Sequence, residues 1–233
     1  AHARPVPVDP DTFALLELCA RCWRDSDGAF DAAQGARMAQ LGFRGETAVA
    51  GPPAGFEAVE LDARGGRVRF TAPGVQLDLG GVAKGHALDA AAEVLREAGI
   101  EQALLHGGTS TVVALGAPPG LAGWRVALER ATGAPVAELC DAALAVSAQH
   151  GRRNDRGEGH VLDPRSGRPA TDDRVAAVVA ARGALADAWS TALLVRADLP
   201  CASGLAGMVG EGPEGARAWR SCGVQGPFLA LEG

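Results

Sequence analysis

Apolar and polar positions alternate along this chain with the periods of both helices and strands. Residues 11–24 and 184–195 are rich in Ala and Leu and contain no Gly or Pro, which predicts two helices. A third helix is expected to follow the Gly-rich segment 80–85 and to stop at Gly99. Residues 56–61 and 67–70 alternate with period two, which predicts a hairpin.

The other expected elements are mostly short apolar runs. Residues 1–9 are Pro-rich and are expected to be extended, whereas residues 200–223 are expected to be helical with breaks at Gly. Because strands and helices do not alternate regularly, the pattern predicts an α+β fold and not a series of βαβ units. The further strands are expected at residues 75–79, 102–106, 112–115, 124–128, 136–139, 144–147, 175–180 and 228–231.

Composition places the chain among ordinary globular proteins. It has 233 residues, of which 47% are hydrophobic and only 4% aromatic, so the core must be built from Ala, Val and Leu. The net charge is -6 and no run of Lys or Arg is present, which argues against a nucleic-acid partner. No apolar run is long enough to span a bilayer. The sequence as given carries no signal peptide and so favours the cytoplasm.

The five cysteines form an odd set that cannot pair completely within one chain. Cys19 and Cys22 make a C-x-x-C, a spacing used in redox and zinc sites. They lie in an expected amphipathic helix, however, and no second C-x-x-C completes a zinc site. The sequence therefore predicts structural thiols.

Asp187 and Thr191 lie four residues apart within the expected helix 184–195, and so on one helical face. A carboxylate and a hydroxyl placed there offer two oxygen ligands to a small cation, and Mg²⁺ shares such ligands with phosphates and water. The alternative is an exposed Asp and a Thr that bonds back to its own helix.

The segment from Asp78 to Gly85, Asp-Leu-Gly-Gly-Val-Ala-Lys-Gly, joins an expected strand to a helix. Its glycines allow the backbone to approach a ligand, and the N–H groups of the helix start favour a phosphate. Lys84 adds a positive charge, and Asp78 can accept from a sugar hydroxyl or a base N–H. The segment is neither a Walker loop nor a dinucleotide fingerprint. A plain Gly-rich turn is the alternative.

Three other segments carry polar groups at turns. His160 precedes the turn residues 163–167, where it can act as an acid or base, orient a diphosphate, or merely cap the turn. Residues 105–111 end a strand in two glycines and three hydroxyls, which suits the wall of a flat-ring pocket or an ordinary hairpin. Residues 25–31 form a turn with an apolar anchor at Phe30.

Taken in order, these segments resemble the ApbE-like flavin transferases, which are FAD:protein FMN transferases. The resemblance rests on the patterns D-L-G-G-x-A-K-G from Asp78, H-x-x-D-P-x-x-G-x-P from His160 and A-D-A-x-x-T from Ala186. Ser26 to Asp31 and Gly107-Gly108 add to it. It implies one ApbE-like (T-fold-like) α+β domain over residues 1–233, two-lobed, with FAD in a cleft between the lobes.

The resemblance also implies an activity. FAD would be cleaved at its pyrophosphate with Mg²⁺, and FMN would pass to a Thr or Ser hydroxyl of an acceptor protein with release of AMP. Two alternatives are a flavin-binding homologue that does not transfer and a metal-dependent FAD pyrophosphatase. The same resemblance also allows a periplasmic or membrane-anchored location for this protein, because relatives are often exported or lipid-anchored.

Matched motif by motif, the resemblance assigns a role to ten residues of this chain. The implied metal ligands are the Asp187 and Thr191 side chains and the Gly81 carbonyl, and His160 and Asp187 are the implied catalytic residues. The implied cofactor contacts are Ala29, Phe30, Asp31, Asp78, Lys84 and Val161.

This sequence departs from the family pattern in three places. The family's N-terminal part, which helps to bind FAD, is absent before Ala1. Thr109 stands where an acidic residue commonly follows the two glycines, and Ala148 stands where a Gly usually follows the serine at Ser147. The first departure can remove part of the cofactor pocket, and the second removes a carboxylate near the metal or flavin.

Overall fold

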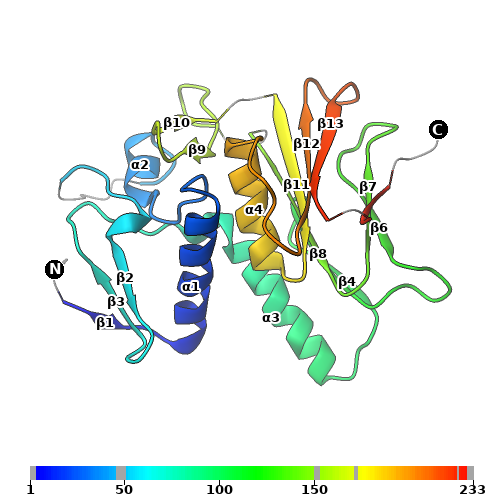
Figure 1. Cartoon of the computed structure of the whole chain (residues 1–233), viewed down its shortest axis with the longest axis horizontal. Coiled ribbons are helices and arrows are strands. Elements are labelled where there is room, and N and C mark those ends of the chain that lie inside the picture. Colours follow the sequence, from blue (N-terminus) through cyan, green and yellow to red (C-terminus); the bar gives the residue numbers. More distant parts are fainter. Residues whose placement is uncertain (1–3, 46–50, 150–152, 171–172, 225, 230–233) are drawn as a thin grey trace. The chain divides into compact units, whose positions relative to one another are not determined.

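The computed structural model describes residues 4–45, 51–149, 153–170, 173–224 and 226–229. The chain forms two compact units, Ala1–Gly81 with Gln149–Ala170, and Val82–Ala148 with Thr171–Gly233. Each unit combines helices with antiparallel strands, which confirms the predicted α+β class (Figure 1). That residues 1–233 act as one domain stays a prediction. No helix among the described residues is long and apolar enough to cross a membrane.

The first unit is organised around helix α1 (Pro10–Asp25). The Asp9 carboxylate caps this helix by accepting from the Thr12 N–H at 2.9 Å. Phe13 and Leu16 of α1 pack with Val68 of a three-stranded antiparallel sheet, in the order β1-β3-β2. The remaining elements are β1 (Val6–Pro7), α2 (Gly35–Gln40), η1 (Phe56–Ala58), β2 (Val59–Asp62), β3 (Arg67–Phe70), η2 (Leu79–Gly81), β9 (Leu162–Asp163) and β10 (Arg168–Pro169).

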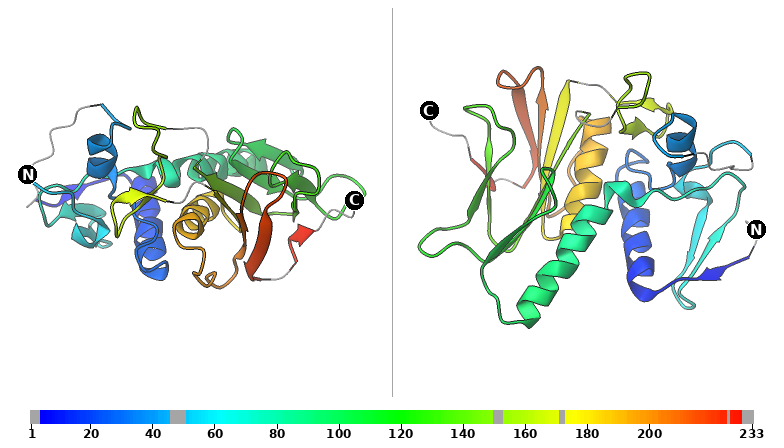
Figure 2. Two further views of the ribbon diagram at one scale, coloured as in Figure 1. Left: turned by 90° about the horizontal axis from the view of Figure 1, so that it is seen from above. Right: turned by 180° about the vertical axis from the view of Figure 1, so that it is seen from behind.

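The second unit is built on a six-stranded antiparallel sheet in the order β13-β12-β11-β8-β5-β4. Helices α3 (Ala83–Glu97) and α4 (Gly183–Val195) contact each other and the central strands of this sheet (Figure 2). The six strands are β4 (Ala103–His106), β5 (Thr111–Leu115), β8 (Ala143–Ala148), β11 (Arg174–Ala180), β12 (Ala206–Glu211) and β13 (Ala218–Gly223). A separate three-stranded antiparallel sheet, in the order β14-β7-β6, consists of β6 (Trp124–Ala127), β7 (Val136–Leu139) and β14 (Phe228–Leu229).

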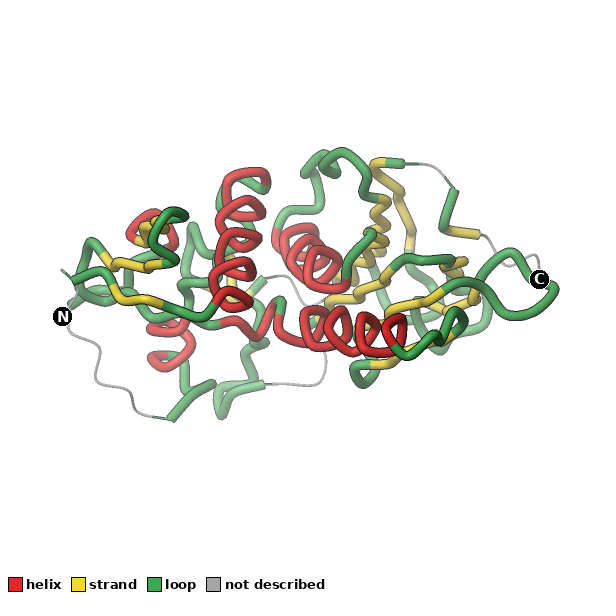
Figure 3. The backbone as a smooth tube through the Cα atoms, turned by 90° about the horizontal axis from the view of Figure 1, so that it is seen from below, coloured by secondary structure: helices red, strands yellow, loops and turns green. Residues whose placement is uncertain are grey.

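Helix α4 is buried on almost every side, which follows from its composition. Asp187 is the only charged residue in its sequence, and an otherwise apolar helix is stable only inside a core. Seen from below, α4 lies directly beside the strands of its sheet (Figure 3). Small residues, mainly Ala and Val on β8 and β11, let the helix approach the sheet closely. Asp187 is consequently fixed in a rigid, water-poor setting.

The predicted strand at residues 75–79 is wrong. Val75 and Gln76 each form one isolated parallel bridge, with Ala54 and Gln34 respectively. Leu79 already belongs to the 3-10 turn η2. The run is short and meets a different neighbour at each bridge, so no ladder can propagate from it.

The helical prediction for residues 200–223 is also wrong, because this region forms the antiparallel hairpin β12–β13. Its many glycines disfavour a helix by about 1 kcal/mol each relative to Ala. Gly204, Gly212 and Gly215 adopt positive φ values of +81°, +105° and +80°, which end or turn the strands. Pairing of β12 with β11 then buries Val209 in the sheet.

Smaller differences concern the ends of elements. Residues 56–58 form the 3-10 turn η1, so the strand predicted from Phe56 begins at Val59. The six-residue helix α2 was not predicted. The last predicted strand is present as β14, whereas its residues 230–231 lie outside the described residues.

Candidate functional site

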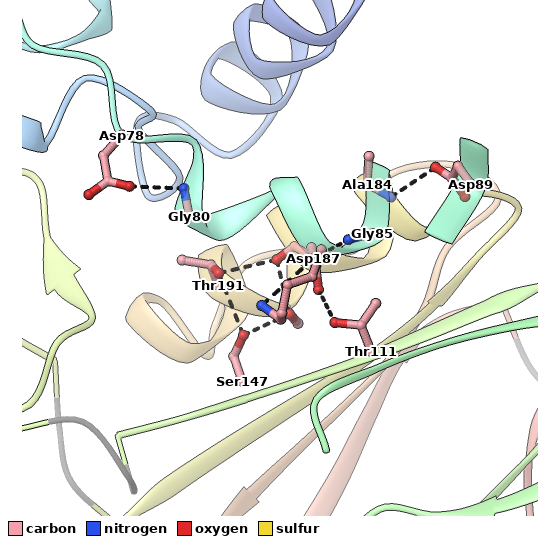
Figure 4. Close-up of polar contacts among 11 residues, drawn as sticks. Asp78, Gly80, Gly85, Asp89, Thr111, Ser147, Ala184, Asp187 and Thr191 are labelled. Carbon is pink, nitrogen blue, oxygen red and sulfur yellow. Dashed lines mark hydrogen bonds and ion pairs between the residues drawn. The ribbon is translucent and has the colours of Figure 1, made fainter. Parts of the chain in front are cut away.

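Asp187 is the centre of the polar cluster in the second unit (Figure 4). Its side chain is only 5% exposed, and both carboxylate oxygens accept a hydrogen bond. Thr111 Oγ1 donates to Oδ1 at 2.7 Å, and the Gly85 N–H donates to Oδ2 at 2.7 Å. The Lys84 ammonium lies 4.0 Å from Oδ2. Residues of α3, β5 and α4 therefore meet at one carboxylate.

The close contact between α3 and α4 depends on glycine. A Cβ built on Gly85 would overlap the backbone of Gly183, which begins α4. The absence of a side chain at both positions lets the start of α3 reach α4, so that the Gly85 N–H meets Asp187. The Asp89 carboxylate secures the same crossing by accepting from the Gly183 and Ala184 N–H groups at 2.6 and 3.1 Å (Figure 4).

Burial raises the pKa of the Asp187 carboxyl above its ordinary value, because the ionised form loses hydration. The Lys84 charge and the bonds from Thr111 and Gly85 oppose this effect. A carboxylate kept inside a protein at such a cost commonly serves a function.

Three hydroxyls, two on α4 and one on β8, form a connected group at the backbone carbonyl of Asp187. Thr191 Oγ1 lies 3.1 Å from the Asp187 carbonyl oxygen, and Ser190 Oγ lies 3.0 Å from the same acceptor. Ser147 Oγ of β8 is 2.7 Å from Ser190 Oγ and 3.5 Å from Thr191 Oγ1. A hydroxyl that donates its proton to a carbonyl keeps its lone pairs, so Thr191 can still offer oxygen to a cation.

The donors of this cluster fit Mg²⁺. The ion takes hard oxygen ligands and usually needs only one or two protein carboxylates, because phosphates and water complete its shell. Asp187 would supply the carboxylate and Thr191 the neutral oxygen, one helical turn apart. Within the described residues, no group of three or more His, Cys, Asp or Glu side chains could hold a metal ion by themselves. Such a site would depend on a phosphate-bearing ligand.

Asp78 and Gly81 lie in the first unit, at the end of its long N-terminal segment. Asp78 Oδ1 accepts from the Gly80 N–H at 2.9 Å, which shapes the turn that includes Gly81 (Figure 4). The same oxygen pairs with the Arg44 guanidinium at 3.1 Å. Arg44 was not identified from the sequence, because an isolated Arg in a loop gives no pattern.

His160 and Val161 lie in the same unit, just before β9. Gln149 is fully buried and holds this segment: its Nε2 donates to the Val161 and Ala170 carbonyls at 2.6 and 3.0 Å. Its Oε1 accepts from the Val161 N–H at 3.0 Å. Arg37 of α2 donates to the Pro164 carbonyl in the following turn. The predicted catalytic His is thus part of a well-anchored hairpin.

Ala29 and Phe30 are 1% and 3% exposed and pack in the interior. The neighbouring Asp31 carboxylate accepts from the Ala33 N–H at 2.6 Å and the Phe56 N–H at 3.2 Å. Burial raises the pKa of Asp31. These contacts show that Asp31 ties two loop segments together.

Of the ten predicted site residues, the structure brings Lys84, Asp187 and Thr191 together in the second unit. The others, Ala29, Phe30, Asp31, Asp78, Gly81, His160 and Val161, lie in the first unit. Sequence reasoning did not single out Thr111, Ser147, Asp89 or Gln149 as partners of this machinery. Thr111, Asp89 and Gln149 are buried and Ser147 is partly buried, but no local pattern reveals which group each one bonds.

The structure also shows where the cysteines lie, and where two of the three departures from the family pattern, Thr109 and Ala148, are found. Cys19 and Cys22 are buried and free, as predicted for structural thiols. Cys201 and Cys222 form a disulfide that the sequence did not indicate. Thr109 is exposed in the turn between β4 and β5, and Ala148 ends β8.

The fold is shared with one family of known proteins. The model of the ApbE family matches residues 1–200. The chain therefore belongs to the ApbE family. Its structure is similar to that of the ApbE protein of Thermotoga maritima, with a TM-score of 0.78 and 26% identity over 94% of this chain and 78% of the other.

Curated relatives carry the name FAD:protein FMN transferase. The relative from Rhodobacter capsulatus is 36% identical over 217 residues, covering 84% of this chain and 40% of that protein. The relative from Treponema pallidum is 31% identical over 228 residues, covering 84% of this chain and 62% of that protein. The chain thus spans less than two thirds of the length of either relative.

Proposed function

We propose that this chain transfers FMN from FAD to a Thr or Ser hydroxyl of an acceptor protein, in a Mg²⁺-dependent reaction that releases AMP. Family membership and the names of the curated relatives support the transferase class. The observation that carries the proposal is the buried Asp187 carboxylate, one helical turn from the Thr191 hydroxyl and 4.0 Å from the Lys84 ammonium.

The proposed reaction is a phosphoryl-type transfer. The acceptor oxygen forms a bond to the phosphorus of the FMN half, and the bond from that phosphorus to the bridging oxygen breaks. AMP leaves with the bridging oxygen, and the acceptor hydroxyl gives up its proton. Such reactions need positioning and charge neutralisation more than covalent help from the protein.

In the second unit, Asp187 and Thr191 are the proposed side-chain ligands of Mg²⁺. The Gly81 carbonyl is proposed as a backbone ligand on the family resemblance alone. The ion, when bound, would neutralise charge on the diphosphate. Lys84 stands beside Asp187 and would add a further positive charge for phosphate oxygens. These roles need a fixed carboxylate, which the bonds from Gly85 and Thr111 provide.

In the first unit, we propose that His160 accepts the proton of the acceptor hydroxyl. A neutral imidazole suits this role near pH 7. The Gln149 bonds to the adjacent Val161 backbone would keep the imidazole at a defined position. The proposed FAD contacts in this unit are Ala29, Phe30, Asp31, Asp78 and Val161.

The test is to incubate the chain with FAD, Mg²⁺ and a Thr-bearing peptide, and to analyse the products by mass spectrometry. Covalent FMN on the peptide with free AMP is expected. Asp187→Asn removes the charge at nearly constant volume, so transfer should fall by at least 100-fold, an effect of a size seen for groups that stabilise transition-state charge. The matched control is Glu93→Ala, an exposed position on α3.

Two other outcomes would contradict the proposed transfer and indicate a different function. Free FMN and AMP with an unmodified peptide would indicate a pyrophosphatase, and FAD bound without turnover would indicate a flavin-binding homologue. Unchanged Mg²⁺-dependent transfer by Asp187→Asn would remove Asp187 from the mechanism.

His160→Ala separates catalysis from binding. If His160 is the base, kcat should fall by about 100-fold or more, in the range of general base catalysis, while the Kd for FAD changes little. Equal losses in kcat and in FAD affinity would make His160 a binding residue instead.

A further inference from the structure

Thr111 is the polar exception in an apolar strand. It begins β5, whose other residues are Val112, Val113, Ala114 and Leu115, and all five are buried. The Thr111 side chain is completely inaccessible to solvent. Val has the same branched shape and an equal preference for strands, so the strand itself does not require the hydroxyl.

The Thr111 hydroxyl donates its hydrogen bond to the Asp187 side chain of α4, and not to a group of the sheet. It donates to Oδ1 at 2.7 Å, and the Gly85 N–H donates to Oδ2 at 2.7 Å (Figure 4). A carboxylate held at both oxygens by donors from two different elements cannot rotate freely. Because each carboxylate oxygen carries two lone pairs, one on each oxygen stays available for a cation.

A purely structural role explains this contact poorly. A buried carboxylate and its hydroxyl donor can often be replaced together by apolar groups at little cost in stability. Asp187 is also the only charged residue of α4, whose packing rests on apolar side chains. The pair therefore has little value for folding alone, whereas orientation of a metal ligand by a neighbouring donor is a common arrangement.

We propose that Thr111 is a positioning residue that orients the Asp187 carboxylate toward the divalent cation. This inference rests on the proposed function, since it assumes that Asp187 binds the metal. Loss of the hydroxyl leaves Oδ1 without its donor, whereas the Gly85 N–H and the Lys84 ammonium both contact Oδ2. A neighbouring group of this kind commonly changes metal affinity or activity by 10–100-fold.

The test compares Thr111→Ser with Thr111→Ala, which differ only by the hydroxyl. Mn²⁺ serves as the probe, and its binding to the FAD-loaded chain without acceptor is followed by electron paramagnetic resonance. Thr111→Ala should raise the Kd for Mn²⁺ at least tenfold, and Thr111→Ser should stay within about threefold of the wild type. Thr111→Val repeats the loss without creating a cavity.

The control is Thr71→Val, which removes a hydroxyl that donates to the Ala58 carbonyl in the first unit and should leave Mn²⁺ binding unchanged. Circular dichroism identifies any variant that does not fold, and the comparison then uses the remaining hydroxyl-free variant. Equal Mn²⁺ affinity of folded Thr111→Ala or Thr111→Val and the wild type overturns the inference. A wild type that binds Mn²⁺ but transfers no FMN refutes the proposed activity only.

Discussion

Asp89 on α3 caps the N-terminus of α4, a helix to which it does not belong. Its carboxylate accepts from the N–H groups of Gly183 and Ala184, and its side chain is only 7% exposed. Arg182 adds a weaker contact at 3.6 Å from a largely exposed side chain. The start of α4 thus depends on an acceptor from another helix, because Arg182 at the cap position makes no side-chain cap.

Replacement of Asp89 by Ala would leave two buried N–H groups without their acceptor. Loss of a helix cap costs about 0.5–2 kcal/mol, and hydrogen bonds to a charged group are worth about 1.5–3 kcal/mol each before any relaxation. Both ranges describe loss of the same two hydrogen bonds, so they are not added together. We expect Asp89→Ala to lower the free energy of unfolding by about 3 kcal/mol. Asp89→Asn keeps one acceptor oxygen and should cost about 1 kcal/mol.

The assay is thermal unfolding followed through the intrinsic fluorescence of the four Trp residues, of which Trp189 is buried on α4 itself. A loss of 3 kcal/mol corresponds to a decrease in Tm of about 6–12 °C for a chain of this size. The control Glu93→Ala lies on α3 in an exposed pair with Arg96 and should change stability by less than about 0.5 kcal/mol. Equal Tm values for Asp89→Ala and Glu93→Ala would refute the capping argument.

Two further predictions concern the cysteines. Burial raises the pKa of both Cys19 and Cys22 to about 12. The folded chain therefore keeps these protons where the unfolded chain loses them, so stability should fall as pH rises above 9, by about 1.4 kcal/mol per thiol at pH 10. Urea titrations at pH 8 and pH 10 measure this loss, and a Cys19→Ala variant that shows the same pH dependence as the wild type would contradict it. The Cys201–Cys222 disulfide joins residues 21 apart, so its removal should cost about 3 kcal/mol. Without reductant, denatured protein should expose three free thiols, Cys19, Cys22 and Cys140; five would disprove the bridge.

Local sequence signals predicted much of the secondary structure. Helix α1 was evident from the Asp9-Pro10 start, and α3 from the stop at Gly99, whose φ is +79°. The strands of the second unit followed from short apolar runs. The error at residues 200–223 arose because β12 pairs with β11 along six residues, an interaction that no local pattern contains.

The polar cluster around Asp187 could be predicted only in part, for the same reason. Asp187 and Thr191 stand out because helical periodicity places them on one face. Thr111, which bonds the Asp187 carboxylate, is 76 residues away from Asp187 in sequence and meets it only after β5 and α4 have packed. Gln149 likewise acquires its partners through the hairpin that it holds.

By itself, the sequence determined the helix periods, the turn glycines and the order of the motifs that mark this family. These depend on backbone preferences within a few residues, which act before any tertiary contact forms. The donors around Asp187, the cap of α4 and the pairing of Cys201 with Cys222 arise only when the chain has folded. Those contacts join residues far apart in the chain, and burial sets their strength by removing the water that would otherwise compete.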